Sequence, residues 1–204
     1  MTQQQGLLSA ELAVIQMLAQ VEPLTQRVTV PLDQALDRVL AQPLLSDINV
    51  PGYDNAAMDG YALRAAEVAP GQPLDVAGVA LAGHAFTDTV PSGSCVRITT
   101  GAVMPPGLDT LVMQEQVQLT QSDLQQQILC QLVPTPGEHV RRAGEDIAKG
   151  AQVFAAGHKL RPADLGLLAS LGFANITVMR QLKVAIFSSG DELVPPGQSL
   201  FVSV

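Results

Sequence analysis

Two acids, an amide and two glycines are packed into the stretch from Gly52 to Gly60, which reads Gly-Tyr-Asp-Asn-Ala-Ala-Met-Asp-Gly. The stretch has neither helical nor strand periodicity, so we expect a tight turn there. Asp and Asn side chains often cap such turns themselves. Two interpretations stay open: the polar side chains only stabilise the turn, or Asp59 projects into a cleft and meets a ligand as a charge or hydrogen-bond partner.

A second candidate site is the segment Arg97–Ala102, where an expected strand ends. The strand ends in the hydroxyls of Thr99 and Thr100, and Gly101 follows them. This order of residue types lets backbone N–H groups face an oxyanion. An ordinary junction between a strand and a turn has the same pattern, so the sequence leaves both interpretations open.

Adjacent arginines, Arg141 and Arg142, precede Gly144, Glu145 and Asp146. A guanidinium group suits phosphate because its fork can donate two hydrogen bonds at once. The cluster therefore either clamps a phosphate group or forms ion pairs within itself.

Near the end of the chain, Gly190 is followed by Asp191 and Glu192. Their carboxylates could hold Mg²⁺, with water completing the octahedron. The histidines have no ligand spacing with one another or with the cysteines, so we expect no zinc site.

Helices and strands must position these candidate residues, and the sequence predicts three helices. Ser9 followed by Glu11 and an apolar pattern predicts a capped amphipathic helix that is closed by Pro23. The spacing of apolar residues predicts a second helix between Pro31 and Pro43. A third is expected from Pro162, with Gly172 as its C-terminal stop.

Between the second and third helices the pattern indicates strands. Short β-rich runs alternate with clusters of Pro, Gly and Ser that are typical of turns. The runs are Leu74–Val79, Cys95–Thr100, Leu111–Leu119 and Ile128–Val133. This alternation of short strands and turns predicts a small all-β module, either a barrel or a sandwich.

The fold class is therefore mixed α and β. We expect a discontinuous helical or linker module over residues 1–46 and 147–180, with the β module inserted at 47–146. Residues 181–204 form the stub of a doubly wound α/β domain. Its first strand is Val184–Phe187, an apolar run of the kind buried on both faces of a parallel sheet. This strand has no partner in the chain, and the polar loop after it lies where such sheets bind ligands.

Composition limits the possible functions. Of the 204 residues, 47% are hydrophobic, which suffices for a real core, and the net charge is −8. This charge argues against a broad nucleic-acid surface, although local arginines can still bind a small anion. We find no secretory signal and no run long enough to span a bilayer, so we expect a soluble, cytoplasmic protein. Cys95 and Cys130 are expected to be buried, reduced thiols.

Singly these clusters are ambiguous, but their order along the chain is specific. Four segments together resemble the molybdopterin molybdenumtransferases, a family that includes the C-terminal domain of gephyrin. The segments are Asn55–Ala62, Thr100–Ala102 with Pro105 and Gly107–Thr110, Arg142 with Gly144–Ile147, and Ser189–Leu193. The resemblance covers about residues 7 to 198.

The resemblance implies an enzyme of molybdenum cofactor biosynthesis that inserts molybdate into adenylated molybdopterin and releases AMP. It implies Mg²⁺ or another divalent cation, and a homodimer whose active cleft lies between subunits. Molybdopterin adenylyltransferase and proteins that mature molybdoenzymes are the expected partners; nucleic acid and membrane are not.

The resemblance also assigns residues. Asp59, Thr100 and Glu192 match positions important for activity, and Asp191 with Glu192 would hold the metal ion. The positions expected to bind substrate are Asn55, Met58, Gly101, Arg142, Gly144, Glu145 and Asp146.

The chain departs from the family pattern at three places. Ala56 stands where the family usually has Ser, Leu108 replaces Ala, and the family's later Gly-rich and Lys-Pro-Gly-Lys-Pro motifs do not follow Gln198. We therefore expect a truncated transferase. The alternatives are a non-catalytic remnant that dimerises or binds partners, and a fragment that aggregates through its open strand edge.

Overall fold

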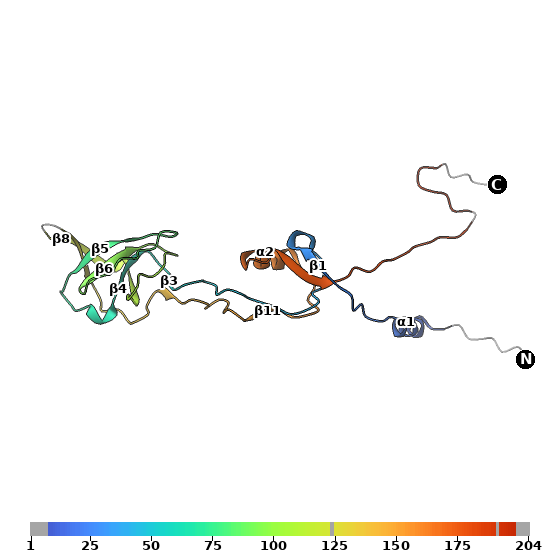
Figure 1. Ribbon diagram of the computed structural model, residues 1–204, viewed down its shortest axis with the longest axis horizontal. Helices are drawn as coiled ribbons and strands as arrows, with labels where there is room; N and C mark the ends of the chain where they lie inside the picture. The colour runs from blue at the N-terminus through green and yellow to red at the C-terminus, as the bar shows by residue number, and fades with distance from the viewer. Residues whose placement is uncertain (1–7, 123–124, 191, 199–204) are drawn as a thin grey trace, which may run out of the picture.

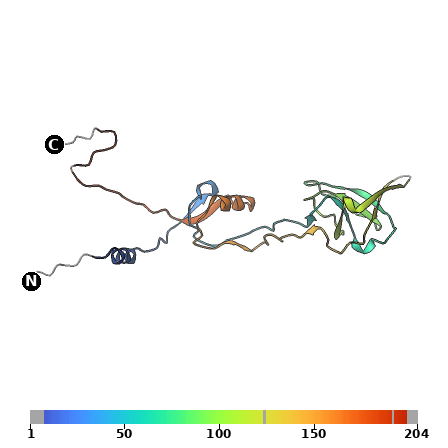
Figure 2. The ribbon, with the colours of Figure 1, turned by 180° about the vertical axis from the view of Figure 1, so that it is seen from behind.

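The structure is a computed structural model that describes residues 8–122, 125–190 and 192–198. The molecule is elongated, with an outer β lobe at one end and a smaller central lobe, joined by a narrow two-stranded ribbon (Figure 1). Two terminal segments leave the central lobe on the side away from the β lobe, and the view from behind shows the same arrangement (Figure 2).

The N-terminal segment contains helix α1 (Ala10–Ala19), which confirms the predicted helix. Ser9 caps it, because the Ser9 side chain accepts a hydrogen bond from the Leu12 N–H at 3.2 Å. No residue of α1 is buried. No helix in the described part of the chain is long and apolar enough to cross a bilayer.

The central lobe contains a two-stranded antiparallel sheet of β1 (Arg27–Pro31) and β12 (Asn175–Met179). A second pair, β2 (Leu44–Leu45) with β11 (Gln152–Phe154), leads into the ribbon. Helix α2 (Pro162–Ser170) packs against the sheet. The helix begins at Pro162 and Gly172 follows it, as predicted. Asp164 lies in its first turn, and Gly172 has a φ of 84°. The shared core consists of Ala35, Leu40, Leu44, Leu160, Leu168, Ile176 and Val178.

The predicted helix between Pro31 and Pro43 is wrong. Pro31 ends strand β1, and only the short 3-10 turn η1 (Leu32–Gln34) follows. Asp37 has a φ of 60°, which an α-helix does not tolerate, and the Leu40 N–H bonds to the His158 carbonyl at 2.9 Å. The apolar spacing does mark core residues, but a turn and irregular backbone present them. The central lobe is therefore mainly strand and turn, not helical.

The β lobe contains β4 (Gly60–Leu63), β5 (Leu74–Ala80), β6 (Ser94–Ile98), β7 (Thr110–Met113), β8 (Val117–Ser122) and β9 (Gln125–Cys130). Among the described residues these strands form one six-stranded sheet in the order β7-β4-β6-β5-β9-β8. All neighbours pair antiparallel except β5 with β6. The predicted strand Leu111–Leu119 is two strands, β7 and β8, separated by the 3-10 turn η3 (Gln114–Gln116). Turn η2 (Ala65–Glu67) follows β4.

Strands β4, β6 and β7 are largely buried on both faces of this sheet, because successive side chains of a strand point to opposite sides, whereas Leu119 of β8 is 61% exposed. Val96 and Leu111 contribute to one apolar core, while Cys95 and Val112 contribute to the other. Both cysteines are free; Cys95 is buried and Cys130 is half-buried. Burial raises the pKa of the Cys95 thiol to about 12, so this thiol is protonated and inert.

The ribbon brings the two ends of the β lobe together. The Ser46 N–H bonds to the Ala151 carbonyl at 2.9 Å, and the Val50 N–H bonds to that of Ile147 at 2.8 Å. At the outer end of the ribbon, β3 (Asn55–Ala56) pairs with β10 (Val140–Arg141).

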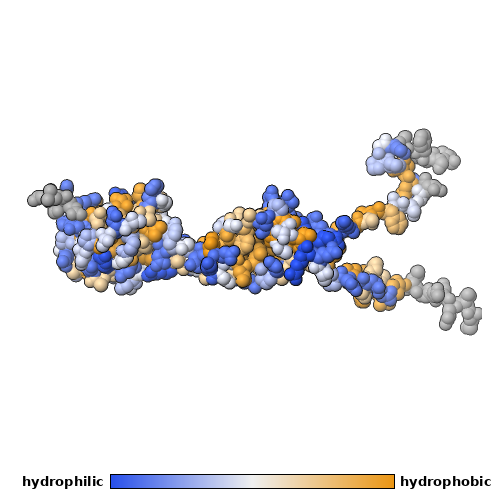
Figure 3. Space-filling model, in the orientation of Figure 1, coloured by the Kyte–Doolittle hydropathy of each residue, from blue (hydrophilic) through white to orange (hydrophobic). Residues whose placement is uncertain are grey.

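The predicted strand Val184–Phe187 does not form. Ile186 and Phe187 are 92% and 90% exposed, and no described residue from 180 to 190 is in a strand. Figure 3 shows hydrophobic residues along both terminal segments. A strand's N–H and C=O groups need a partner, and no neighbouring strand lies beside this run among the described residues.

Candidate functional site

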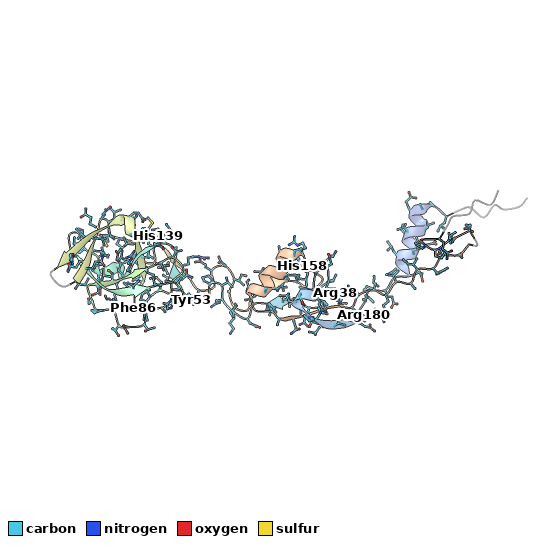
Figure 4. The ribbon with its side chains drawn as sticks, turned by 90° about the horizontal axis from the view of Figure 1, so that it is seen from above. Arg38, Tyr53, Phe86, His139, His158 and Arg180 are labelled. Carbon is cyan, nitrogen blue, oxygen red and sulfur yellow. The ribbon has the colours of Figure 1, made fainter. Side chains whose placement is uncertain are left out.

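Three of the four motif segments converge where the β lobe meets the ribbon. Asn55 of β3 pairs with Arg141 of β10 on one side and forms a bridge with Val103 on the other. The Gly101 N–H bonds to the Ala56 carbonyl at 2.8 Å. Tyr53 marks this end of the lobe in Figure 4. The loop around Asn55 therefore joins the segment that contains Thr100 to the segment that contains Arg142.

Asp59 and Thr100 form the centre of this site. The Thr100 N–H and the Thr100 hydroxyl both donate to Oδ1 of Asp59, each at 2.7 Å. These two bonds, the backbone bond first, hold the pKa of the Asp59 carboxyl below its usual range. Both residues are exposed. Oδ2 of Asp59 has no hydrogen bond within the described residues, so an ionised oxygen faces solvent and can accept a bond from a ligand.

Gly60 fixes Asp59 at the start of β4, which lies between β6 and β7. A Cβ atom on Gly60 would lie 2.1 Å from the Val112 carbonyl oxygen. Only glycine therefore allows β4 to pair closely with β7 at this point. The close pairing orients the residue before it, Asp59, toward Thr100.

Arg141 forms its ion pairs within the arginine cluster. Arg141 Nε donates to Glu145 Oε1 at 2.6 Å, and Arg141 Nη2 donates to Asp146 Oδ2 at 2.7 Å. Gly144 allows this turn, because it has a φ of 77° and a Cβ atom would lie 2.9 Å from Asn49 Oδ1. Of the two interpretations of the sequence, self-pairing is the one seen for Arg141, Glu145 and Asp146.

Asp54 is a site residue that the sequence did not single out. Its Oδ2 accepts a hydrogen bond from Arg142 Nη1 at 2.6 Å, and its Oδ1 accepts one from the Ala143 N–H at 2.8 Å. The Ala143 bond first, and then the Arg142 bond, lower the pKa of Asp54. Asp54 lies 88 positions from Arg142, so no local spacing could indicate this contact.

Two further residues that were predicted to bind substrate, Asn55 and Met58, differ in their exposure to solvent. Asn55 is buried, and its Nδ2 donates to the Tyr53 carbonyl at 3.3 Å, so this side chain supports the loop. Met58 is 43% exposed and open to a ligand.

The fourth motif does not join the other three. Glu192 is exposed and lies in the C-terminal segment, which leaves the far side of the central lobe (Figure 1). Asp191 lies outside the described residues. Within the described ranges no three His, Cys, Asp or Glu residues are grouped to hold a metal ion. Among the carboxylates of the converging segments, Asp54, Glu145 and Asp146 are hydrogen-bonded to arginine side chains or backbone N–H groups, whereas Asp59 keeps one open oxygen.

Known proteins are similar to this chain over most of its length. Residues 8–172 match the family model described as the MoeA N-terminal region (domain I and II). The molybdopterin molybdenumtransferase of Haemophilus influenzae is 44% identical over 194 residues, which are 95% of this chain and 47% of that protein. Gephyrin of Dictyostelium discoideum is 31% identical over 80% of the chain and 24% of its own length.

A solved structure has the same fold. The molybdopterin biosynthesis MoeA protein of Pyrococcus horikoshii superposes with a TM-score of 0.81 at 31% identity, over 92% of this chain and 48% of that one. The chain thus spans about half the length of the bacterial transferase and of the solved structure. The fold, the matched residues and the identities agree: this chain belongs to the MoeA family and corresponds to its N-terminal region.

Proposed function

We propose that this chain acts in cytoplasmic molybdenum cofactor biosynthesis, as the N-terminal part of an enzyme that inserts molybdate into adenylated molybdopterin and releases AMP. The observation that carries the proposal is the Asp59–Thr100 pair, which three converging segments hold at one end of the β lobe. The names of the relatives support the same reaction.

The chemistry needs groups that position a phosphoanhydride and offset its charge. Asp59 is ionised, so it serves as a hydrogen-bond acceptor for N–H or O–H groups of the substrate and not as an acid. Arg142 keeps N–H donors on a half-exposed guanidinium, and these suit a phosphate group. Thr100 orients Asp59 and thereby sets the direction of its open oxygen.

Mg²⁺ or another divalent cation belongs to this proposal, but the described residues do not supply its site. Glu192, with Asp191, is the oxygen donor set that would contribute to it. We therefore assign no step of the reaction to the cation. We also propose that the chain works as a homodimer and receives its substrate from a molybdopterin adenylyltransferase.

The alternative is a non-catalytic module that dimerises or binds partners. It is favoured by the apolar side chains of α1, of which Ile15, Met17 and Leu18 are 61–65% exposed. Such a surface is typical of a protein–protein contact.

A complementation assay separates the two functions. The purified chain is mixed with the separately expressed C-terminal half of the Haemophilus influenzae relative, with adenylated molybdopterin, molybdate and Mg²⁺. We expect turnover in this mixture and none with either part alone. Asp59→Asn should lower turnover about a hundredfold, because an amide replaces the open oxygen while Oδ1 still accepts from Thr100. Asp88→Asn, at an exposed position in the same lobe, is the matched control. Absence of turnover from a folded mixture would favour the binding module.

A further inference from the structure

Asp54 lies at the crossing of the three converging segments. Its backbone carbonyl accepts from the Met104 N–H at 3.0 Å, which joins it to the segment after Thr100. Its carboxylate accepts from the Ala143 N–H and from Arg142, which joins it to the arginine segment. An aspartate is ionised at neutral pH, and these bonds lower the pKa of Asp54 further. One residue therefore connects the Thr100 side of the site with the Arg142 side.

The Arg142 side chain depends on this contact for its direction. It is 55% exposed, and Nη1 donates to Asp54, its one hydrogen bond to a side chain among the described residues. The guanidinium lies over Gly137, where a Cβ atom would be 3.2 Å from Nη2. A long side chain without an anchor samples many rotamers, whereas a guanidinium fixed at one nitrogen offers its other N–H groups in a defined plane.

We infer that Asp54 is a positioning residue, which holds the Arg142 guanidinium so that its remaining N–H donors meet a phosphate group. The inference rests on the proposed function for its ligand, the phosphoanhydride of adenylated molybdopterin. Asp54 and a phosphate can bind Arg142 together, because a guanidinium has five N–H donors and Asp54 uses one of them.

The negative charge of Asp54 has a second effect on anion binding, which opposes the positioning effect. A carboxylate beside an arginine also reduces the local positive potential, so a purely electrostatic role would weaken the binding of anions. Both groups are partly exposed and screened by solvent, which limits that effect. Replacing Asp54 therefore distinguishes the positioning role from the electrostatic role. If Asp54 positions Arg142, its replacement weakens anion binding; if Asp54 only repels anions, its replacement strengthens it.

The test uses the 204-residue chain and inorganic pyrophosphate as the probe, with binding measured by calorimetric titration at low salt. The variants are Asp54→Asn, Arg142→Ala and the double variant. Asparagine keeps an oxygen for the Ala143 N–H, but it places an NH2 donor where Oδ2 accepts from Arg142. We expect both single variants to bind pyrophosphate about tenfold more weakly, and the double variant to bind like Arg142→Ala, because Asp54 acts through the arginine.

Two controls exclude a general loss of structure. The thermal midpoint of Asp54→Asn should stay within a few degrees of that of the original chain, and Asp88→Asn should bind pyrophosphate unchanged. The inference is overturned if the original chain does not bind pyrophosphate, if Asp54→Asn binds it equally or more tightly, or if the two single effects add. Failure of the proposed function is a separate result: pyrophosphate binding follows the expected pattern while the complemented mixture has no turnover.

Discussion

Two short segments rich in apolar residues, Thr110–Met113 and Val184–Phe187, have opposite structures in this molecule. In the first, Leu111 and Val112 are 0% and 4% exposed, because strand β4 lies beside them and each side chain enters one of the two cores. In the second, Ile186 and Phe187 are 92% and 90% exposed. The composition is similar, so the difference comes from the neighbouring strand. An apolar run becomes a strand where another strand satisfies its backbone groups.

The largest expected effect comes from truncating one side chain in each run. Leu111→Ala should reduce the free energy of unfolding of the β lobe by about 2–5 kcal/mol, because it leaves a cavity in a closed core. Ile186→Ala should change it by less than about 0.5 kcal/mol. Urea unfolding followed by tyrosine fluorescence measures this, since the two tyrosines, Tyr53 and Tyr61, lie in or next to that lobe. Equal effects of the two variants would contradict the comparison.

A smaller contrast is expected between two glycines. Gly60→Ala should destabilise the β lobe by about 1–3 kcal/mol, because the new methyl group meets the Val112 backbone, which cannot rotate away. Gly166→Ala, in helix α2, should stabilise the central lobe by about 0.5–1 kcal/mol, since its Cβ meets nothing within 4 Å. Thermal unfolding followed by circular dichroism and by tyrosine fluorescence distinguishes the lobes. A stable Gly60→Ala variant would show that β4 and β7 can separate.

The smallest expected effect is a dependence on pH. Asp54 and Asp59 have pKa values below the ordinary value of about 3.9, so their contribution to stability is present above that pH and is lost as pH falls below it. The unfolding midpoint of the β lobe should be level from pH 7 to about 5 and should fall below about pH 4. In Asp59→Asn the fall should be shallower. An identical acid profile for the variant would mean that the Thr100 bonds contribute nothing.

Local signals in the sequence were sufficient for several elements. Ser9 and Pro162 mark the starts of α1 and α2, and Gly172 marks the end of the second, because caps and stops depend on nearby residues. The apolar spacing after Pro31 was misleading. Leu32, Ala35 and Leu40 do face the core, but the pairing of β1 with a strand far away in the sequence overrides the helical pattern.

The candidate site was predictable only in part, because some of its contacts join residues far apart in the sequence. The order of the motifs indicated Asp59, Thr100 and Arg142, and the structure brings their segments together. The position of Asp54 within this site depends on contacts with residues 88 and 89 positions away, which no periodicity encodes. Glu192 remains apart from the other motif residues in the described chain, so its predicted role in metal binding stays a prediction.

The ribbon also determines the length of chain that must be closed into a loop when the central lobe forms. Thr29 of β1 and Thr177 of β12 face each other across 148 positions, and the entropic cost of closing a loop grows with its length. The folded β lobe places Ser46 beside Ala151, which leaves only the short stretches from Thr29 to Ser46 and from Ala151 to Thr177 to be closed. The folded β lobe thus acts as a crosslink between the two segments that flank it. We expect the sheet of β1 and β12 to form faster because this crosslink shortens the loops.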